Sequence, residues 1–301
     1  MSIQSNILLL EASGFLGSAL LKAYNYTNIS YTYKNNRILG GFYFDSQIDN
    51  ISNLIQVLPK KPTAAIILLG KTEIDFCYAN PIISSSINVY SIIKIIDKLL
   101  FYNIKPIFVS SDGVFEGNKS FWSESDNTNP IIEYGRQKIL VENHLNQIGF
   151  PCVIVRLPKL LSCNGSEICL INNWIKSLGN QNQILCAVDQ FFTPSAVEDV
   201  ADAIVFLSRN NMSGIFHLGG NDRISRRNLL DLVINEYNNF AQVRAKIVDC
   251  SLSDIPVLDL RPKDTSLNSD KFKKIYPHKF IGISEIVKSS VASYFNKLNI
   301  S

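Results

Sequence analysis

The stretch that decides the fold runs Ile7-Leu8-Leu9-Leu10-Glu11-Ala12-Ser13-Gly14-Phe15-Leu16-Gly17, close to the start of the chain. Its four consecutive aliphatic residues are typical of a short strand buried on both faces. A glycine-containing turn follows, and the apolar spacing after it predicts a helix over about 16–24. A strand, a tight glycine turn and a helix can bind a dinucleotide's pyrophosphate at the helix N-terminus. The candidate residues of this turn are Ser13, Gly14, Phe15, Leu16 and Gly17.

Glu11 occupies the position where such a turn usually has its first glycine. A carboxylate beside a pyrophosphate is repulsive unless it points away. A side chain is also strained where glycine is usual. Two glycines alone are a weak signal, because a plain strand-to-helix connection with close packing would also contain them. Its place directly after the first strand favours the dinucleotide site.

The first half of the chain continues to alternate buried strands with amphipathic helices. Strands are predicted at 30–33, 42–44, 64–69, 106–109 and 152–155, and helices at 51–58, 86–102 and 134–148. These strands are continuously hydrophobic, as parallel strands covered on both faces are. The predicted fold class is therefore α/β, a Rossmann-type doubly wound parallel sheet with a smaller C-terminal substrate-binding lobe.

The alternation becomes less regular after Arg156. Helices are predicted near 198–208, 227–238 and 285–298, and a strand at 214–218. The chain contains no internal repeat, and no linker-like segment marks a boundary between two domains. We expect residues 1–157 to form an NADP-binding Rossmann domain with returning elements near 191–218. Residues 158–301 are expected to form mainly the substrate-binding lobe.

Composition excludes several classes of protein. The chain has 301 residues, of which 46% are hydrophobic and 18% charged, so wholesale disorder is excluded. A net charge of +3 is too small to indicate nucleic acid or an anionic membrane as a partner. Neither a membrane span nor a signal peptide is recognisable, so a cytoplasmic protein is expected, with a homodimer as one possible assembly. The six cysteines include no Cys-x-x-Cys, which favours reduced thiols and no metal site.

The end of the second strand bears on the choice of cofactor. An NAD site places an acid there for the ribose 2′-hydroxyl, whereas an NADP site places cations there for the 2′-phosphate. No Asp or Glu occurs between Ala12 and Phe44, whereas Lys34 and Arg37 are present. We therefore expect NADP(H) to be preferred over NAD(H), although a solvated loop would also carry such cations.

A candidate catalytic group follows the strand at 106–109. Ser110-Ser111-Asp112 ends that strand, and Tyr134 and Lys138 lie four residues apart on one face of the next helix. An ammonium beside a phenol lowers the phenol's pKa, and the phenol can then exchange a proton with a carbonyl oxygen. A serine hydroxyl can hold that oxygen. The pair Tyr90 and Lys94 has the same spacing but no hydroxyl-bearing strand end closely before it.

Taken together, these motifs resemble the extended short-chain dehydrogenases. The most similar group is the dTDP-4-dehydrorhamnose reductases, with the regulatory β-subunit of methionine adenosyltransferase as a relative. The resemblance rests on Val109-Ser110-Ser111-Asp112-Gly113-Val114-Phe115-Glu116-Gly117, Glu124-Ser125-Asp126 with Pro130, Tyr134-Gly135 with Lys138 and Glu142, Ile87-Asn88-Val89, Phe192-Thr193-Pro194, Glu198-Asp199-Val200-Ala201, Gly214-Ile215-Phe216-His217-Leu218 and Leu260-Arg261-Pro262 with Leu267 and Lys271.

The resemblance implies roles for further residues. Ser111, Tyr134 and Lys138 would be catalytic, with the last two also touching the cofactor. Asp45 would lie near the adenine, the stretch Leu69-Gly70-Lys71 near the cofactor riboses, and Val114, Phe115 and Arg261 near a sugar nucleotide. Three departures from the family pattern are Glu11, Leu69-Gly70-Lys71 in place of an Ala-Ala pair, and Gly113 in place of a tyrosine.

The function implied by the resemblance is NADPH-dependent reduction of a nucleotide-linked 4-keto sugar, in deoxysugar or surface-polysaccharide biosynthesis. Two alternatives stay open. One is a nucleotide-sugar epimerase or dehydratase that retains its cofactor, although only one acid follows Ser111 where dehydratases usually carry two. The other is a non-catalytic, dinucleotide-binding regulatory subunit, which Glu11 and Gly113 favour.

Overall fold

The computed structural model describes residues 6–165, 169–181 and 183–298. Its centre is a seven-stranded parallel sheet in the order β11-β6-β5-β4-β1-β2-β3. These strands are β1 (Ile7–Leu10), β2 (Ile29–Tyr33), β3 (Phe42–Tyr43), β4 (Ala64–Ile67), β5 (Lys105–Ser111), β6 (Val153–Leu157) and β11 (Gly214–His217). The predicted Rossmann-type α/β fold is confirmed.

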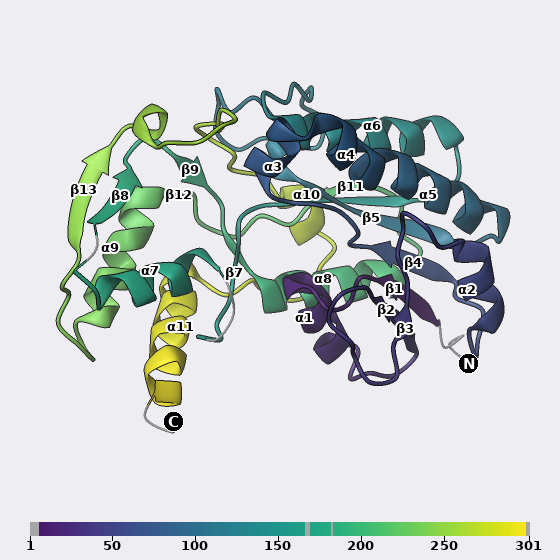
Figure 1. Cartoon of the computed structure of the whole chain (residues 1–301), viewed down its shortest axis with the longest axis horizontal. Helices are drawn as coiled ribbons and strands as arrows, with labels where there is room; N and C mark the ends of the chain where they lie inside the picture. Colours follow the sequence, from purple (N-terminus) through teal and green to yellow (C-terminus); the bar gives the residue numbers. More distant parts are fainter. Residues whose placement is uncertain (1–5, 166–168, 182, 299–301) are drawn as a thin grey trace.

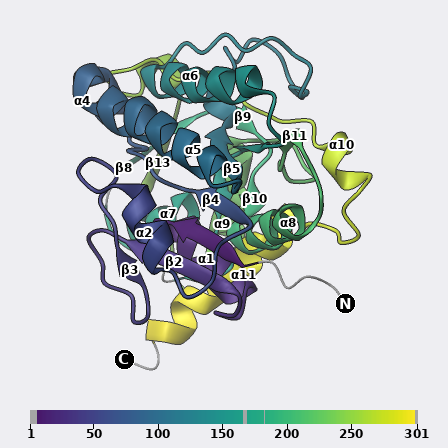
Figure 2. The same ribbon diagram turned by 90° about the vertical axis from the view of Figure 1, so that its right-hand side faces the viewer.

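Helices cover both faces of the sheet, which explains the continuous hydrophobicity of its central strands (Figure 2). On one face α1 (Phe15–Ala23) packs beside α8 (Val197–Arg209), and both share a core cluster with β1, β4 and β6. On the other face lie α2 (Ile51–Val57), α5 (Ser91–Phe101) and α6 (Glu133–Ile148). No helix in the described ranges is both long and apolar enough to cross a membrane.

A second, smaller body of structure stands beside the sheet, at the left of Figure 1. It contains the parallel pair β8 (Gln183–Ala187) and β13 (Lys246–Cys250) with α7 (Leu170–Leu178), α9 (Arg226–Tyr237) and α11 (Ile283–Leu298). Trp174, Leu230 and Val287 belong to its separate hydrophobic cluster. The short pairs β7 (Leu160–Leu161) with β10 (Ser195–Ala196), and β9 (Phe191–Phe192) with β12 (Ile224–Ser225), complete the strands of this half. We call this body the C-terminal lobe.

The segment before α5 differs from the expected single helix over 86–102. Two short helices, α3 (Ile74–Ala79) and α4 (Pro81–Ser85), come first and were not predicted. A π-helical turn over Ser86–Tyr90 then leads into α5. Helices of five or six residues carry little periodic signal, and a π turn shifts the register of the hydrophobic pattern. The sequence therefore indicated a helix here, but it did not indicate the two short helices or the π-helical turn that precede α5.

Candidate active site

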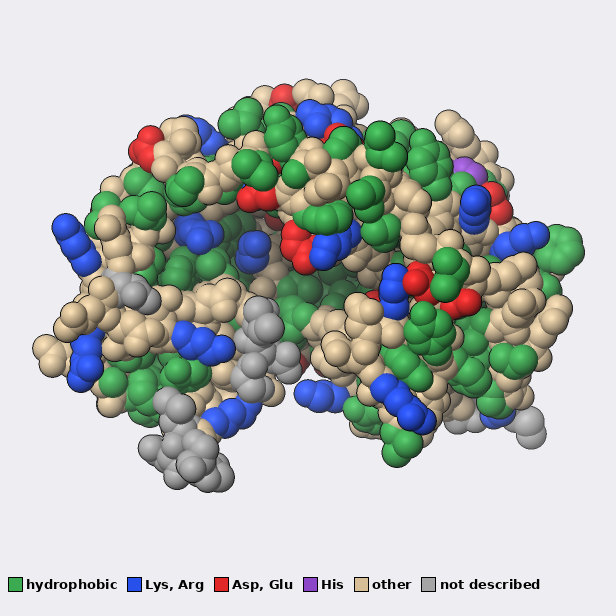
Figure 3. Space-filling model, viewed as in Figure 1, with side chains coloured by type: hydrophobic (Ala, Val, Ile, Leu, Met, Phe, Trp, Pro, Cys, Tyr) green, Lys and Arg blue, Asp and Glu red, His purple; other side chains and the backbone are tan. Residues whose placement is uncertain are grey.

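A cavity of about 890 Å³ lies between the carboxyl edge of the sheet and the C-terminal lobe. The space-filling view shows the molecule hollowed there, with Lys and Arg side chains in the hollow and along its rim (Figure 3). The predicted site residues that line it are Gly14, Phe15, Leu16, Gly17, Gly70, Ser111, Tyr134, Lys138 and Arg261. Its volume falls in the range of cofactor and ligand sites.

The glycine turn forms one end of this cavity, and its two glycines are suited to their positions for different physical reasons. A Cβ on Gly17 would lie 2.6 Å from the Glu11 carbonyl oxygen, so only glycine lets α1 approach β1 this closely. A Cβ on Gly14 would meet nothing within 4 Å, because that side of the turn is open. Gly14 is also the N-cap of α1 and provides no side chain to cap it. Since no described side chain caps this helix start, its main-chain N–H groups are available to a phosphate, and the turn fits a dinucleotide.

Glu11 lines the same cavity, in a conformation that glycine would adopt more easily. Its φ is +69°, which places it in the left-handed region. Its main-chain N–H donates to Thr32 Oγ1 at 2.9 Å, and its carboxylate accepts a hydrogen bond from Ser13 Oγ. The carboxylate thus has a partner on the turn itself.

Tyr134 and Lys138 lie on consecutive turns of α6 and both line the cavity. Lys138 is buried, its Nζ donates to the Val109 carbonyl oxygen on β5 at 2.9 Å, and it lies 5.5 Å from the centre of the Tyr134 ring. The ammonium is therefore fixed between the strand end and the phenol. Tyr90 is 64% exposed and does not line the cavity, so the second Tyr-x-x-x-Lys pair is separate from the site.

The pKa values of the pair differ from the simple expectation. Burial raises the pKa of Tyr134 above its ordinary value, and the nearby Asp112 and Cys77 raise it further. Burial lowers the pKa of Lys138 to about 8, although Glu142 and Cys77 act in the opposite direction. The acidic phenol expected from the neighbouring ammonium is therefore not found in the chain alone, where loss of solvation has the largest effect on the pKa of Tyr134. Tyr134 is a neutral phenol that carries its proton.

Ser111 ends β5 on the same cavity wall. Its Oγ accepts from the Gly113 N–H at 3.1 Å and donates to Asp112 Oδ1 at 3.0 Å. Gly113 is buried, and a Cβ there would lie 3.0 Å from Ile132, so the loop packs directly against the start of α6. The hydroxyl is held in place by its own loop.

Asn88 lies in the π-helical turn and supports the site. The sequence analysis quoted it in the Ile87-Asn88-Val89 motif but assigned it no role. It is buried, and its Oδ1 accepts from the Lys71 N–H at 2.7 Å. Its Nδ2 donates to the Lys71 carbonyl oxygen at 2.9 Å and to Gln137 Oε1 at 2.7 Å. Asn88 therefore joins the turn after β4 to α6 beside Tyr134.

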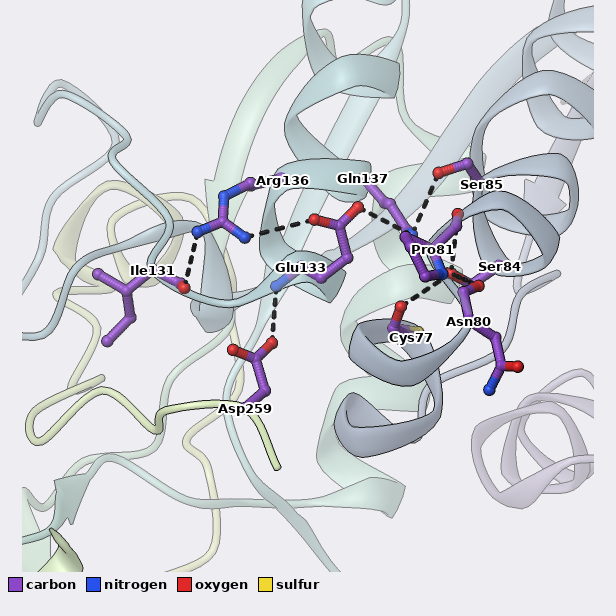
Figure 4. Close-up of polar contacts among 10 residues, drawn as sticks. All are labelled: Cys77, Asn80, Pro81, Ser84, Ser85, Ile131, Glu133, Arg136, Gln137 and Asp259. Carbon is purple, nitrogen blue, oxygen red and sulfur yellow. Dashed lines mark hydrogen bonds and ion pairs between the residues drawn. The ribbon is translucent and has the colours of Figure 1, made fainter. Parts of the chain in front are cut away.

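Gln137 extends this network from α6 to α4. Its Nε2 donates to Ser84 Oγ at 2.8 Å, and Figure 4 shows it also directed at Ser85 and Glu133. Its side chain is fully buried. The helix that carries Tyr134 and Lys138 is thereby tied to its neighbours.

A segment of the C-terminal half, residues 258–261, is fastened over the same region. Asp75 Oδ1, on α3, accepts from Arg261 Nη2 at 2.8 Å and from the N–H groups of Leu258 and Asp259. Asp259 Oδ2 accepts from the Glu133 N–H at the start of α6, as Figure 4 shows. We call residues 258–261 the strap. It fixes Arg261 at the cavity.

The other predicted cofactor residues are not among those that line the cavity. Lys34 forms an ion pair with Asp45 at 2.8 Å, and Arg37 is exposed. Lys71 pairs with Glu73 at 3.0 Å, and Leu69 is buried in the core. The Lys34–Asp45 pair had no signal in the sequence, because the two residues belong to different loops.

Val114 and Phe115, expected to face a sugar nucleotide, are fully buried. They pack with Trp122 and Leu267 in a separate cluster, where the Phe115 ring stacks on Trp122. Neither side chain lines the cavity. Lys159 and Arg226 do line the cavity, and the sequence analysis did not select either.

The family model for the RmlD substrate binding domain matches residues 5–296. The chain belongs to this family. A curated relative, the dTDP-4-dehydrorhamnose reductase of Sinorhizobium fredii, is 23% identical over 71% of this chain and 75% of its own length. Methionine adenosyltransferase 2 subunit beta of Xenopus tropicalis is also 23% identical, over 71% of this chain and 65% of its own. The resemblance inferred from the motifs is thus confirmed at the level of the family.

Solved structures agree with the fold. The dTDP-4-dehydrorhamnose reductase of Bacillus anthracis, solved in complex with NADP, superimposes with a TM-score of 0.79. It covers 97% of this chain and 98% of its own, at 19% identity. At that identity the likeness supports the architecture alone.

Proposed function

We propose that this protein reduces a nucleotide-linked 4-keto sugar with NADPH. The observation that carries the proposal is the convergence of Ser111, Tyr134 and Lys138 on one cavity that also begins at the glycine turn of α1. A hydride donor bound on the turn and a carbonyl held by the hydroxyls would share that space. The family assignment and the naming of its reductase relatives support the same reaction class.

Tyr134, Ser111 and Lys138 would each have a separate role in this reduction. Tyr134 donates its proton to the carbonyl oxygen, because a neutral phenol carries that proton at neutral pH. Ser111, held by Gly113 and Asp112, orients the same oxygen. Lys138, fixed by Val109, would bind the hydroxyls of the nicotinamide ribose and stabilise the phenolate left by proton transfer. A nicotinamide bound beside these residues would supply the hydride.

The direct test is loss of NADPH absorbance in the presence of a panel of 4-keto nucleotide sugars. Tyr134→Phe should lower turnover by about 10²–10⁴-fold, the usual contribution of a general acid, and leave NADPH binding intact. Tyr90→Phe is the matched control, because its ring is exposed outside the cavity. Full activity in Tyr134→Phe would refute the catalytic assignment.

NADPH preference rests on Lys34 and Arg37 at the end of β2. The Lys34–Asp45 ion pair weakens the argument for Lys34 and leaves Arg37 as its main support. Replacing both cations by alanine should weaken NADPH about tenfold or more, at about 1.5–3 kcal/mol for each charged hydrogen bond, and should spare NADH. Equal affinities of the unmodified protein for the two cofactors would contradict the preference.

A dinucleotide-binding regulatory subunit is the second candidate. It is favoured by Glu11 in the pyrophosphate turn and by the similarity to the methionine adenosyltransferase subunit. A protein that binds NADPH but turns over no keto sugar in the panel would support this candidate over the reductase. An epimerase would instead interconvert sugars without net consumption of NADPH.

A further inference from the structure

Three buried polar residues form a row across the sheet, close to its carboxyl edge. Ser110 on β5 is the register partner of Arg156 on β6, and Arg156 is in turn the register partner of His217 on β11. Their side chains are buried, whereas the side chains around them in the sheet core are mainly aliphatic. Ser111, the candidate catalytic hydroxyl, is the next residue of β5. The polar row therefore adjoins the candidate active site.

Glu142, on α6, joins this row to the helix above it. Its side chain is buried, and its Oε1 accepts from Ser110 Oγ at 2.5 Å and from Arg156 Nε at 3.1 Å. Its Oε2 accepts from Arg156 Nη2 at 2.7 Å, and Arg156 Nη1 lies 3.4 Å from His217 Nε2. We call Ser110, Glu142, Arg156 and His217 the clamp. Buried side chains of the clamp thus connect four elements, α6, β5, β6 and β11.

The clamp acts on the helix that carries the candidate catalytic pair. Lys138 precedes Glu142 by four residues, so the two side chains leave the same face of α6. Lys138 Nζ donates to the Val109 carbonyl oxygen, and Glu142 accepts from the Ser110 hydroxyl. Successive turns of α6 are therefore fastened to successive residues of β5. Two attachments fix both the position of the helix along the strand and its rotation about its own axis.

Stability alone does not account for a buried ion pair of this kind. Removing two charges from water is costly, and apolar side chains of similar volume are often equally stabilising or better. Apolar contacts are, however, non-directional, so they would permit several placements of α6 against the sheet. The hydrogen bonds of Glu142 have fixed lengths and directions and permit one.

We propose that Glu142 is a positioning residue, which through the clamp holds Tyr134 and Lys138 at the required distance from Ser111. The inference rests on the proposed function and adds to it a group that touches neither substrate nor cofactor. A misplacement of about 1 Å by a change far from the reacting atoms can lower turnover by about 10²-fold. Loss of the clamp should therefore slow the reaction although every candidate catalytic side chain is still present.

The first test replaces the ion pair by apolar side chains in the double variant Glu142→Met/Arg156→Met. Thermal unfolding should show that the fold is retained, since such replacements are often neutral or stabilising. With a 4-keto nucleotide sugar, kcat should fall by about 10²-fold while KM changes little. The NADPH dissociation constant should rise by about tenfold, because Lys138 would no longer be aligned with the nicotinamide ribose.

A second variant, Ser110→Ala, removes only the attachment to β5 and leaves the ion pair with Arg156 intact. It should fold normally and lower kcat in the same direction, by at least about threefold. Asp97→Asn/His144→Gln is the matched control, because it removes a 2.7 Å polar contact of the same helix on its partly exposed side. Turnover and NADPH affinity of this control should equal those of the unmodified protein.

The outcomes separate the inference from the function on which it rests. An unchanged NADPH dissociation constant in the double variant overturns the inference, because Lys138 would not have moved. Unchanged kcat in Ser110→Ala, or a rise in KM alone, also overturns it and leaves the reductase proposal standing. If the double variant loses its stability, Ser110→Ala decides. If the unmodified protein binds NADPH but reduces no keto sugar, the proposed function fails and the NADPH titrations of both variants decide the inference.

Discussion

At the scale of single residues, His217 and Glu11 are held in states that each would avoid in an unfolded chain. His217 is completely buried at the end of β11, where its Nδ1 lies 3.0 Å from the Trp122 carbonyl oxygen. Burial, reinforced by the neighbouring Arg156, lowers its pKa to about 3. Glu11 is held at a positive φ inside the cavity. Both states have measurable consequences.

His217 should make the protein sensitive to acid. In the unfolded chain a histidine has a pKa of about 6.5, so between that value and the native one the unfolded state binds a proton that the native state does not. Stability should therefore fall as the pH falls through this window, by at most about 1.4 kcal/mol per pH unit.

Urea unfolding at a series of pH values measures this effect. His217→Gln should flatten the dependence between about pH 6 and pH 4, whereas the exposed His278→Gln should retain it. An unchanged slope in His217→Gln would show that His217 is not the group responsible.

Glu11→Gly should stabilise the fold and tighten the cofactor. A non-glycine residue in a sparsely populated backbone region costs about 1–3 kcal/mol, which glycine avoids. Removal of the carboxylate also removes repulsion toward the pyrophosphate. Thermal unfolding and NADPH titration measure the two effects, and Glu11→Gln separates charge from strain. Unchanged or weaker NADPH binding in Glu11→Gly would mean that the carboxylate does not face the cofactor.

At the scale of elements, the start of α1 provides a matched pair of glycine substitutions. Gly17→Ala should destabilise the protein by about 1–3 kcal/mol, because its Cβ would overlap main-chain atoms of Glu11 and Ala12 in the turn after β1. Gly14→Ala should fold normally, since its φ is −79° and its Cβ would lie in open space. The Gly14 variant should nevertheless bind NADPH more weakly, because the new methyl group enters the cavity.

Denaturant unfolding and NADPH titration of both variants test this division. The expected pattern is lost stability for Gly17→Ala and lost affinity with normal stability for Gly14→Ala. Full NADPH affinity in Gly14→Ala would place the pyrophosphate elsewhere than on this turn.

At the scale of the whole molecule, the site exists only because the C-terminal half returns to the sheet. The strap connects Asp75 on α3 with the start of α6 through Asp259, and it presents Arg261 to the cavity. β11 joins the edge of the sheet beside β6, so the chain crosses between the two bodies more than once. Substrate affinity therefore depends on contacts distant from the glycine turn.

Asp75→Ala should loosen the strap. It removes the acceptor shared by Leu258, Asp259 and Arg261, so Arg261 would no longer be held ready for the substrate. We expect the KM for the nucleotide sugar to rise by roughly tenfold, as expected when a charged hydrogen bond is lost, with the NADPH dissociation constant nearly unchanged. Steady-state kinetics and cofactor titration distinguish these quantities. A parallel loss of NADPH binding would indicate a general disturbance of the fold.

The sheet was predictable because its signal is local. Strands such as β1 and β6 are short, continuous aliphatic runs, and a parallel strand covered on both faces leaves this mark whatever its neighbours are. The C-terminal lobe was less predictable. In β8 and β13 several side chains are partly or fully exposed, and within the described residues these strands form a two-stranded sheet of their own, so their sequences resemble loops.

The same distinction applies to the site. By itself the sequence determined the parallel sheet, the glycine turn, and the placement of Ser111, Tyr134 and Lys138 at neighbouring strand and helix ends, because these features depend on spacing along the chain. Only the tertiary structure decided the raised pKa of Tyr134, the fastening of the strap and the arrival of Lys159 and Arg226 in the cavity. Burial and long-range contact set solvation and charge, and no local pattern records them.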